Sequence, residues 1–154
     1  MTTVAHIRLS ADEAEIVLAE LAPIEAAATD PGRRDAFATL REVVERGELD
    51  DAAAATLDPL LELALQTGRI RAIHGPAGEQ AALRLYRRLP SGTALRQTAE
   101  EVSEALVALR GRELEAVSLS ALGPAAYSIS LSAGGVELTI RLDRQGARVA
   151  SVAA

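Results

Sequence analysis

The chain has 154 residues, of which 49% are hydrophobic and 25% charged, and its formal net charge at pH 7 is −6. This length and composition fit one globular domain, or two very small ones, and exclude a disordered, collagen-like or disulfide-stapled chain. Because cysteine and lysine are absent, thiol nucleophiles, thiolate metal sites and Schiff-base chemistry are excluded as well.

The first elements predicted along the chain are a short strand and a helix. Residues 3–9 alternate between apolar and polar side chains, which predicts a strand. Ser10 and Glu13 have the spacing of a capping box, which predicts a helix from residue 11 onward. We expect Pro23 to kink or end this helix.

Three further helices are predicted before residue 90. Asp30 and Pro31 begin one that ends at Gly47, and Asp50 or Asp51 begins the next, which ends at Gly68. Asp58-Pro59 is expected to interrupt that helix. Gly75-Pro76 predicts a break, followed by a helix over residues 77–89 and a loop over residues 90–92.

The remaining chain is predicted to be a long helix followed by a sheet. Apolar residues recur at helical spacing between Leu95 and Leu109, which predicts a helix over residues 93–110 that packs on the apolar face of the sheet. The period then changes to two, with Gly134-Gly135 as a hairpin turn and residues 147–152 as a weaker fourth strand.

These elements predict a single α+β domain over residues 1–154. A helical part of about four helices occupies residues 10–90, and a long helix with a four-stranded antiparallel meander occupies residues 91–154. Residues 3–9 are candidates for an N-terminal edge strand of that meander.

Charge is distributed unevenly along the chain. Residues 1–67 hold 14 acidic and 5 basic side chains, whereas residues 68–112 hold 4 acidic and 8 basic ones. We therefore expect the arginine-rich centre to pack beside the acidic segment, within the chain or across a dimer. The overall acidity argues against a nucleic-acid partner, because backbone binding depends on neutralising phosphates.

Arginines supply the candidate ligand-binding residues. Arg69, Arg71 and His74 precede a glycine-bearing helix opening, where unpaired amides attract anions, although a plain helix connection explains the same pattern. Arg84, Arg87 and Arg88 form a basic face that either binds an acidic group or complements the negative end of its helix.

One face of the predicted sheet carries short hydroxyl side chains where charged ones are usual. This face is either a solvated polar surface or an interface for self-association or a protein partner. Its residues are Ser118, Ser120, Ser128, Ser130, Ser132 and Thr139.

The sequence contains few candidates for catalysis or cofactor binding. His6 and His74 match no metal-ligand spacing, no Gly-x-Ser-x-Gly motif occurs, and no cofactor is predicted. The absence of long apolar runs predicts a cytoplasmic protein without a membrane partner. Lysine and asparagine, whose codons are rich in A, are both missing, which indicates a GC-rich and therefore bacterial genome as the source. We expect a non-catalytic protein that forms a homodimer or binds a protein partner. The alternatives are a sensing module for a small anion and a hydrolase-type enzyme that uses carboxylates.

Overall fold

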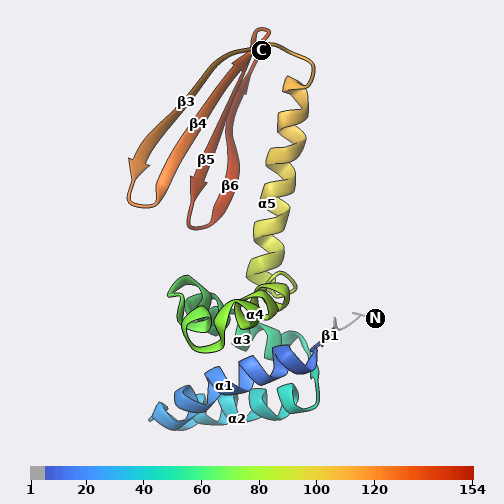
Figure 1. Ribbon diagram of the computed structural model, residues 1–154, viewed down its shortest axis with the longest axis vertical. Helices are drawn as coiled ribbons and strands as arrows, with labels where there is room; N and C mark the ends of the chain where they lie inside the picture. Colours follow the sequence, from blue (N-terminus) through green and yellow to red (C-terminus); the bar gives the residue numbers. More distant parts are fainter. Residues whose placement is uncertain (1–5) are drawn as a thin grey trace. The chain divides into compact units, whose positions relative to one another are not determined.

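In the computed structural model, which describes residues 6–154, the chain forms two compact units that divide between Thr93 and Ala94. Helices precede a four-stranded antiparallel sheet (Figure 1), so the predicted α+β class is confirmed. The division falls close to residue 91, where the sequence predicts the change from a helical part to a helix with a sheet.

The first unit contains four helices and a short ribbon. The helices are α1 (Ala11–Ala27), α2 (Pro31–Glu45), α3 (Asp51–Gln66) and α4 (Arg69–Tyr86). The ribbon pairs β1 (Ile7–Arg8) with β2 (Glu48–Leu49). The apolar stripes of all four helices meet in one core, whose most deeply buried side chains include Leu21, Leu40, Val44, Leu49, Ile70 and Leu85.

The predicted caps begin the first three helices. The Ser10 side chain accepts a hydrogen bond from the Glu13 amide while the Glu13 side chain accepts one from the Ser10 amide, which completes the capping box. Asp30 caps α2 and Asp50 caps α3 in the same way, each accepting a hydrogen bond from an amide three residues later.

Several expected boundaries in the helical unit differ from the structure. Pro23 does not end α1 and Pro59 does not interrupt α3, where Leu57 and Leu61 on either side of the proline are buried in the core. The break predicted at Gly75-Pro76 is confirmed, with a φ of 70° at Gly75, and the residues before it, from Arg69 onward, are also helical. Residues 90–92 are the first turn of α5 (Pro90–Leu106) rather than a loop.

The second unit contains most of α5, a 3-10 turn (Val107–Leu109) and the sheet. Its strands are β3 (Leu114–Gly123), β4 (Ala126–Ala133), β5 (Val136–Asp143) and β6 (Gly146–Ala153), in that order across the sheet. Gly134 and Gly135 both have positive φ and form the predicted hairpin turn between β4 and β5.

The N-terminal strand does not join this sheet. In the described part of residues 3–9, Ile7 pairs with Leu49 and Arg8 with Glu48, while residues 3–5 lie outside the described residues. The Leu9 amide also donates a hydrogen bond to the Gly47 carbonyl, so this segment is held by the turn that precedes α3. The expectation of an additional edge strand on the meander is therefore wrong.

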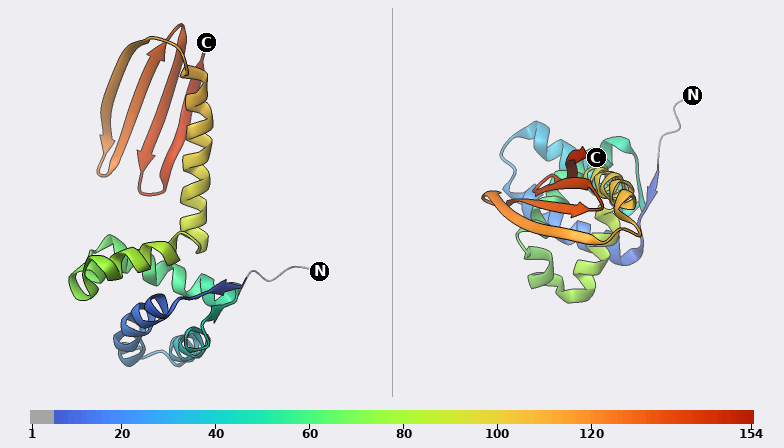
Figure 2. Two further views of the ribbon diagram at one scale, coloured as in Figure 1. Left: turned by 45° about the vertical axis from the view of Figure 1, so that its right-hand side comes forward. Right: turned by 90° about the horizontal axis from the view of Figure 1, so that it is seen from above.

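The apolar face of the sheet is covered by α5 as predicted, but only in part. Val102 packs on Leu138 and Ile140 of β5, with Ala105 and Leu109 partly buried around them. In Figures 1 and 2, α5 lies on the β6 side of the sheet and β3 is the strand farthest from it.

Candidate functional site

The main hollow in the helical unit is a groove of about 1040 Å³ between α1, α2 and α3. Its floor is apolar and includes the two prolines that lie inside helices. The principal apolar lining residues are Pro23, Ile24, Ala27, Phe37, Pro59, Leu60 and Leu63. Because α1 and α3 continue through their prolines, the parts of these two helices that line the groove stay helical.

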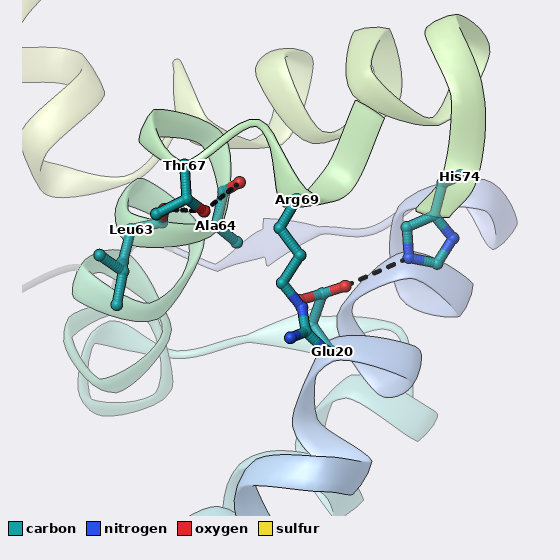
Figure 3. Close-up of polar contacts among 6 residues, drawn as sticks. All are labelled: Glu20, Leu63, Ala64, Thr67, Arg69 and His74. Carbon is teal, nitrogen blue, oxygen red and sulfur yellow. Dashed lines mark hydrogen bonds and ion pairs between the residues drawn. The ribbon is translucent and has the colours of Figure 1, made fainter. Parts of the chain in front are cut away.

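Two lining residues of the groove, Glu20 and Arg69, belong to an ion cluster centred on Glu20. Arg69 donates from Nε to Oε2 of Glu20 at 2.9 Å, and Nε2 of His74 lies 3.3 Å from Oε1. Figure 3 shows both side chains reaching from α4 toward the carboxylate on α1. The Glu20 side chain is only 12% exposed, so these contacts engage a largely desolvated carboxylate.

Two of the three threonines that line the groove, Thr56 and Thr67, bond to backbone carbonyls of α3. Thr67 donates to the Leu63 carbonyl at 2.9 Å, as Figure 3 shows, and Thr56 donates to the Ala52 carbonyl at 3.0 Å. These bonds leave the hydroxyl protons unavailable to a ligand. The remaining side-chain donors of the lining are those of Thr29, in the connection before α2, and of the arginines.

The structure places the first predicted ligand group, Arg69, Arg71 and His74, in the opening turns of α4. Arg69 and His74 meet at Glu20, whereas Arg71 pairs with Glu79 at 3.0 Å and does not reach the groove. Each of the three side chains thus contacts a carboxylate. They do not converge on a common empty space.

The second predicted group is divided between two roles. Arg88 binds Glu13 at 2.6 Å through Nη2 and donates from Nη1 to the Arg8 carbonyl at 2.7 Å. Within residues 6–154, Arg84 and Arg87 have no ion-pair partner, and they line a shallow hollow of about 490 Å³ with Arg8 and Arg88. This hollow is a small basic surface at the end of α4.

The expected packing of the arginine-rich centre beside the acidic segment is confirmed within the chain. Arg69 and Arg88 of the central segment bind Glu20 and Glu13 of α1. Burial alone raises the pKa of Glu13, but the Ser10 amide and the Arg88 guanidinium outweigh it and hold that pKa below its usual value.

The hydroxyl face of the sheet has no helix on it among the described elements of the second unit. Ser118 and Ser120 of β3 are exposed, and Ser128, Ser130, Ser132 and Thr139 are half-buried. Cross-strand contacts account for part of this burial, since Ser130 lies 3.4 Å from Thr139 and Ser132 donates to Glu115. The six residues do share one face, as their register requires.

The opposite, apolar face contains a feature that sequence reasoning missed. On β3, Leu114, Val117 and Leu119 are 54%, 57% and 65% exposed, although they pair with Ala133, Leu131 and Ile129 of β4. Four strands spaced about 4.8 Å apart span roughly 14–19 Å, more than one helix about 10 Å wide can cover. This comparison of widths could have revealed the open strip from the sequence.

The arrangement contains few elements of a catalytic site. Glu20 and His74 are adjacent, but His74, Tyr86 and Tyr127 are not among the residues that line the groove. Burial raises the pKa of Tyr86, and the nearby carboxylates of Glu62 and Asp58 raise it further. Among the described residues, no three His, Asp or Glu side chains come together as a metal-ligand set.

Within the part of the chain that the structure describes, no helix is both long and apolar enough to cross a membrane. The chain matches no protein-family model, and neither a curated protein nor a solved structure is significantly similar to it.

Proposed function

We propose that this protein is a non-catalytic, cytoplasmic bacterial protein that acts through protein–protein contacts, and that it forms a homodimer through strand β3. The observation that carries this proposal is the strip of half-exposed apolar side chains on β3, formed by Leu114, Val117 and Leu119. Contiguous apolar surface at the edge of a sheet is typical of an interaction site.

The edge of β3 supports the same proposal. It is the first strand of the sheet, so one side of its backbone has no strand beside it among the described residues. Natural edge strands are usually protected by charge, proline or a bulge in the middle of the strand. From Ala116 to Gly123 this strand has neither charge nor proline, and its irregularities lie near its two ends.

A second copy of the chain fits this edge by symmetry. Antiparallel pairing of two β3 strands around Ser118 places Val117 of one copy opposite Leu119 of the other, on the same face of a joint sheet. Glu115 then faces Ala121, so the two carboxylates stay apart. The apolar strips merge on one side and the hydroxyl faces merge on the other.

Substitution of Leu119 tests the proposed dimer. We expect sedimentation velocity or light scattering to give twice the monomer mass for the wild type and the monomer mass for Leu119→Glu, because a charge then lies in the interface. Leu63→Glu is the matched control, since Leu63 is 61% exposed but lies on the helical unit. A wild type that stays monomeric at high concentration, or equal dissociation of both variants, would show that β3 is not a dimer interface.

A further inference from the structure

The groove between α1, α2 and α3 has an apolar lining that is partly exposed to solvent. Leu63 is 61% exposed, and Pro23, Ala27 and Pro59 are exposed as well, while Ile24 and Phe37 are half-buried. These residues come from three helices and form one continuous surface. Contiguous exposed apolar residues of this kind mark a contact surface.

The openness of the lining favours a large occupant over a small molecule. A small-molecule site buries 70–90% of its ligand in a concave cavity of roughly 300–1,000 Å³. Here the volume is about 1040 Å³, and half of the ten apolar residues that line it are exposed. A trough between helices suits the apolar face of another helix, which presents residues at i, i+3, i+4 and i+7.

The charged side chains at the groove indicate which residues should lie beside the apolar face of a bound helix. Its two carboxylates already have partners, because Glu20 binds Arg69 and His74, and Asp30 accepts the Arg33 amide. The guanidinium groups have capacity left. Within residues 6–154, the Arg33 side chain has no ion-pair partner, and Arg69 uses only Nε in its bond to Glu20.

We propose that this groove binds the apolar face of an amphipathic helix from a partner protein, with acidic residues beside that face to meet Arg33 and Arg69. The apolar floor supplies the contact area, and the two arginines orient the helix along the groove. This proposal rests on other residues than the proposed dimer, because the groove is lined by the helical unit and β3 belongs to the sheet.

A displayed peptide library tests the proposal without knowledge of the natural partner. The library consists of 18-residue amphipathic helices with leucines at helical spacing and with acidic, neutral or basic flanking positions. It is selected on the full-length protein, and the enriched peptides are then measured by fluorescence anisotropy. We expect enrichment of acidic-flanked helices.

Two variants locate the binding. Leu63→Glu should weaken the enriched peptides about tenfold or more, because it places a charge in the apolar floor. Arg33→Gln should weaken acidic-flanked peptides about two- to fivefold, as for an exposed ion pair, and raised salt should have a similar effect. Leu119→Glu, the matched control on the sheet, should leave peptide affinity unchanged even if it dissociates the dimer.

Several results would overturn the proposal. One is that no enriched peptide loses affinity for the Leu63→Glu variant. Another is that the selection enriches helices with basic flanking residues. The third is that Leu119→Glu weakens peptide binding as much as Leu63→Glu does. Laurate serves as a probe for the other ligand class. If laurate binds saturably, loses affinity in Leu63→Glu and no peptide is enriched, the groove is a site for small amphiphilic anions instead.

Discussion

Glu13 is a buried carboxylate at the start of α1, and its side chain joins three segments of the helical unit. It accepts a hydrogen bond from the Ser10 amide at 2.9 Å and binds Nη2 of Arg88 at 2.6 Å, while Arg88 also donates to the Arg8 carbonyl. These contacts stabilise the ionised form more than burial disfavours it, so the pKa of Glu13 is lowered from 4.5.

The lowered pKa predicts how Glu13 contributes to stability as pH changes. Its contribution is fully present above the unfolded-state pKa of 4.5 and is lost as the pH falls through the lower folded-state pKa. Glu13→Gln keeps a side chain that can complete the capping box but removes the charge that binds Arg88. We expect the free energy of unfolding of this variant at pH 7 to be about 1–3 kcal/mol lower than that of the wild type.

Urea unfolding of Glu13→Gln and the wild type at several pH values measures this difference. The gap between the two proteins should be largest near neutral pH and should shrink as the pH falls below about 4.5. A gap that stays constant down to pH 3 would mean that the charge of Glu13 adds nothing to stability. Glu15→Gln is a control, because Glu15 is exposed on the same helix.

Single residues also show where sequence reasoning succeeds. The capping box of Ser10 and Glu13 was predictable because its partners are three residues apart and its geometry is local. The uneven charge distribution predicted that α1 and the arginine-rich segment attract each other. It could not identify Arg88 as the partner of Glu13, because that pairing depends on how four helices pack.

At the scale of elements, local rules predicted the type of each element better than its ends. Proline lacks an amide and costs a helix interior about 3 kcal/mol, so Pro23 and Pro59 were expected to interrupt their helices. Both helices nevertheless continue: Leu57 and Leu61 are buried in the core on either side of Pro59, and Leu21 is buried in the core before Pro23. Tertiary packing outweighs the cost of a proline inside a helix, and this packing cannot be read from the local sequence pattern.

The connection between α4 and α5 depends on one glycine and one distant cap. The α3 side chain Asp58 is 7% exposed and accepts hydrogen bonds from the Ser91 amide at 2.9 Å and from the Ser91 hydroxyl at 2.7 Å. A Cβ on Gly92 would lie 1.9 Å from the Tyr86 carbonyl oxygen, which is backbone and cannot move aside. This explains why residues 90–92 begin a helix: the cap comes from α3, far away in sequence.

The close approach at Gly92 predicts that Gly92→Ala destabilises the helical unit by about 1–3 kcal/mol or more, as overpacking does. Gly32→Ala is the matched control, because Gly32 also lies in the first turn of a helix and its nearest neighbour, Asp30, is 3.4 Å from an added Cβ. Helix propensity alone should make that variant equal to the wild type or more stable. Thermal unfolding followed by circular dichroism compares the two, and equal melting temperatures would contradict the close contact.

At the scale of the whole molecule, the two units differ in how much apolar surface they bury. The helical unit has a broad core with contributions from all four of its helices, whereas the core of the sheet unit is centred on Val102, Leu138 and Ile140. A unit of about 60 residues is marginally stable unless it gains support from a disulfide, a metal or association. The chain has no cysteine, and the open strip on β3 offers association.

This difference predicts that raising the protein concentration stabilises the sheet unit but not the helical unit. If β3 pairs with a second copy, mass action adds to the stability of the sheet as concentration rises above the dimer dissociation constant. Hydrogen exchange read by mass spectrometry should then slow in β3 as concentration rises, while exchange in α1–α3 stays the same. In the Leu119→Glu variant, the amides of β3 should exchange at every concentration as fast as those of the dilute wild type. If hydrogen exchange slows equally in both units as concentration rises, the cause is general aggregation. If the exchange rate of β3 does not change with concentration, the strip stays open in solution.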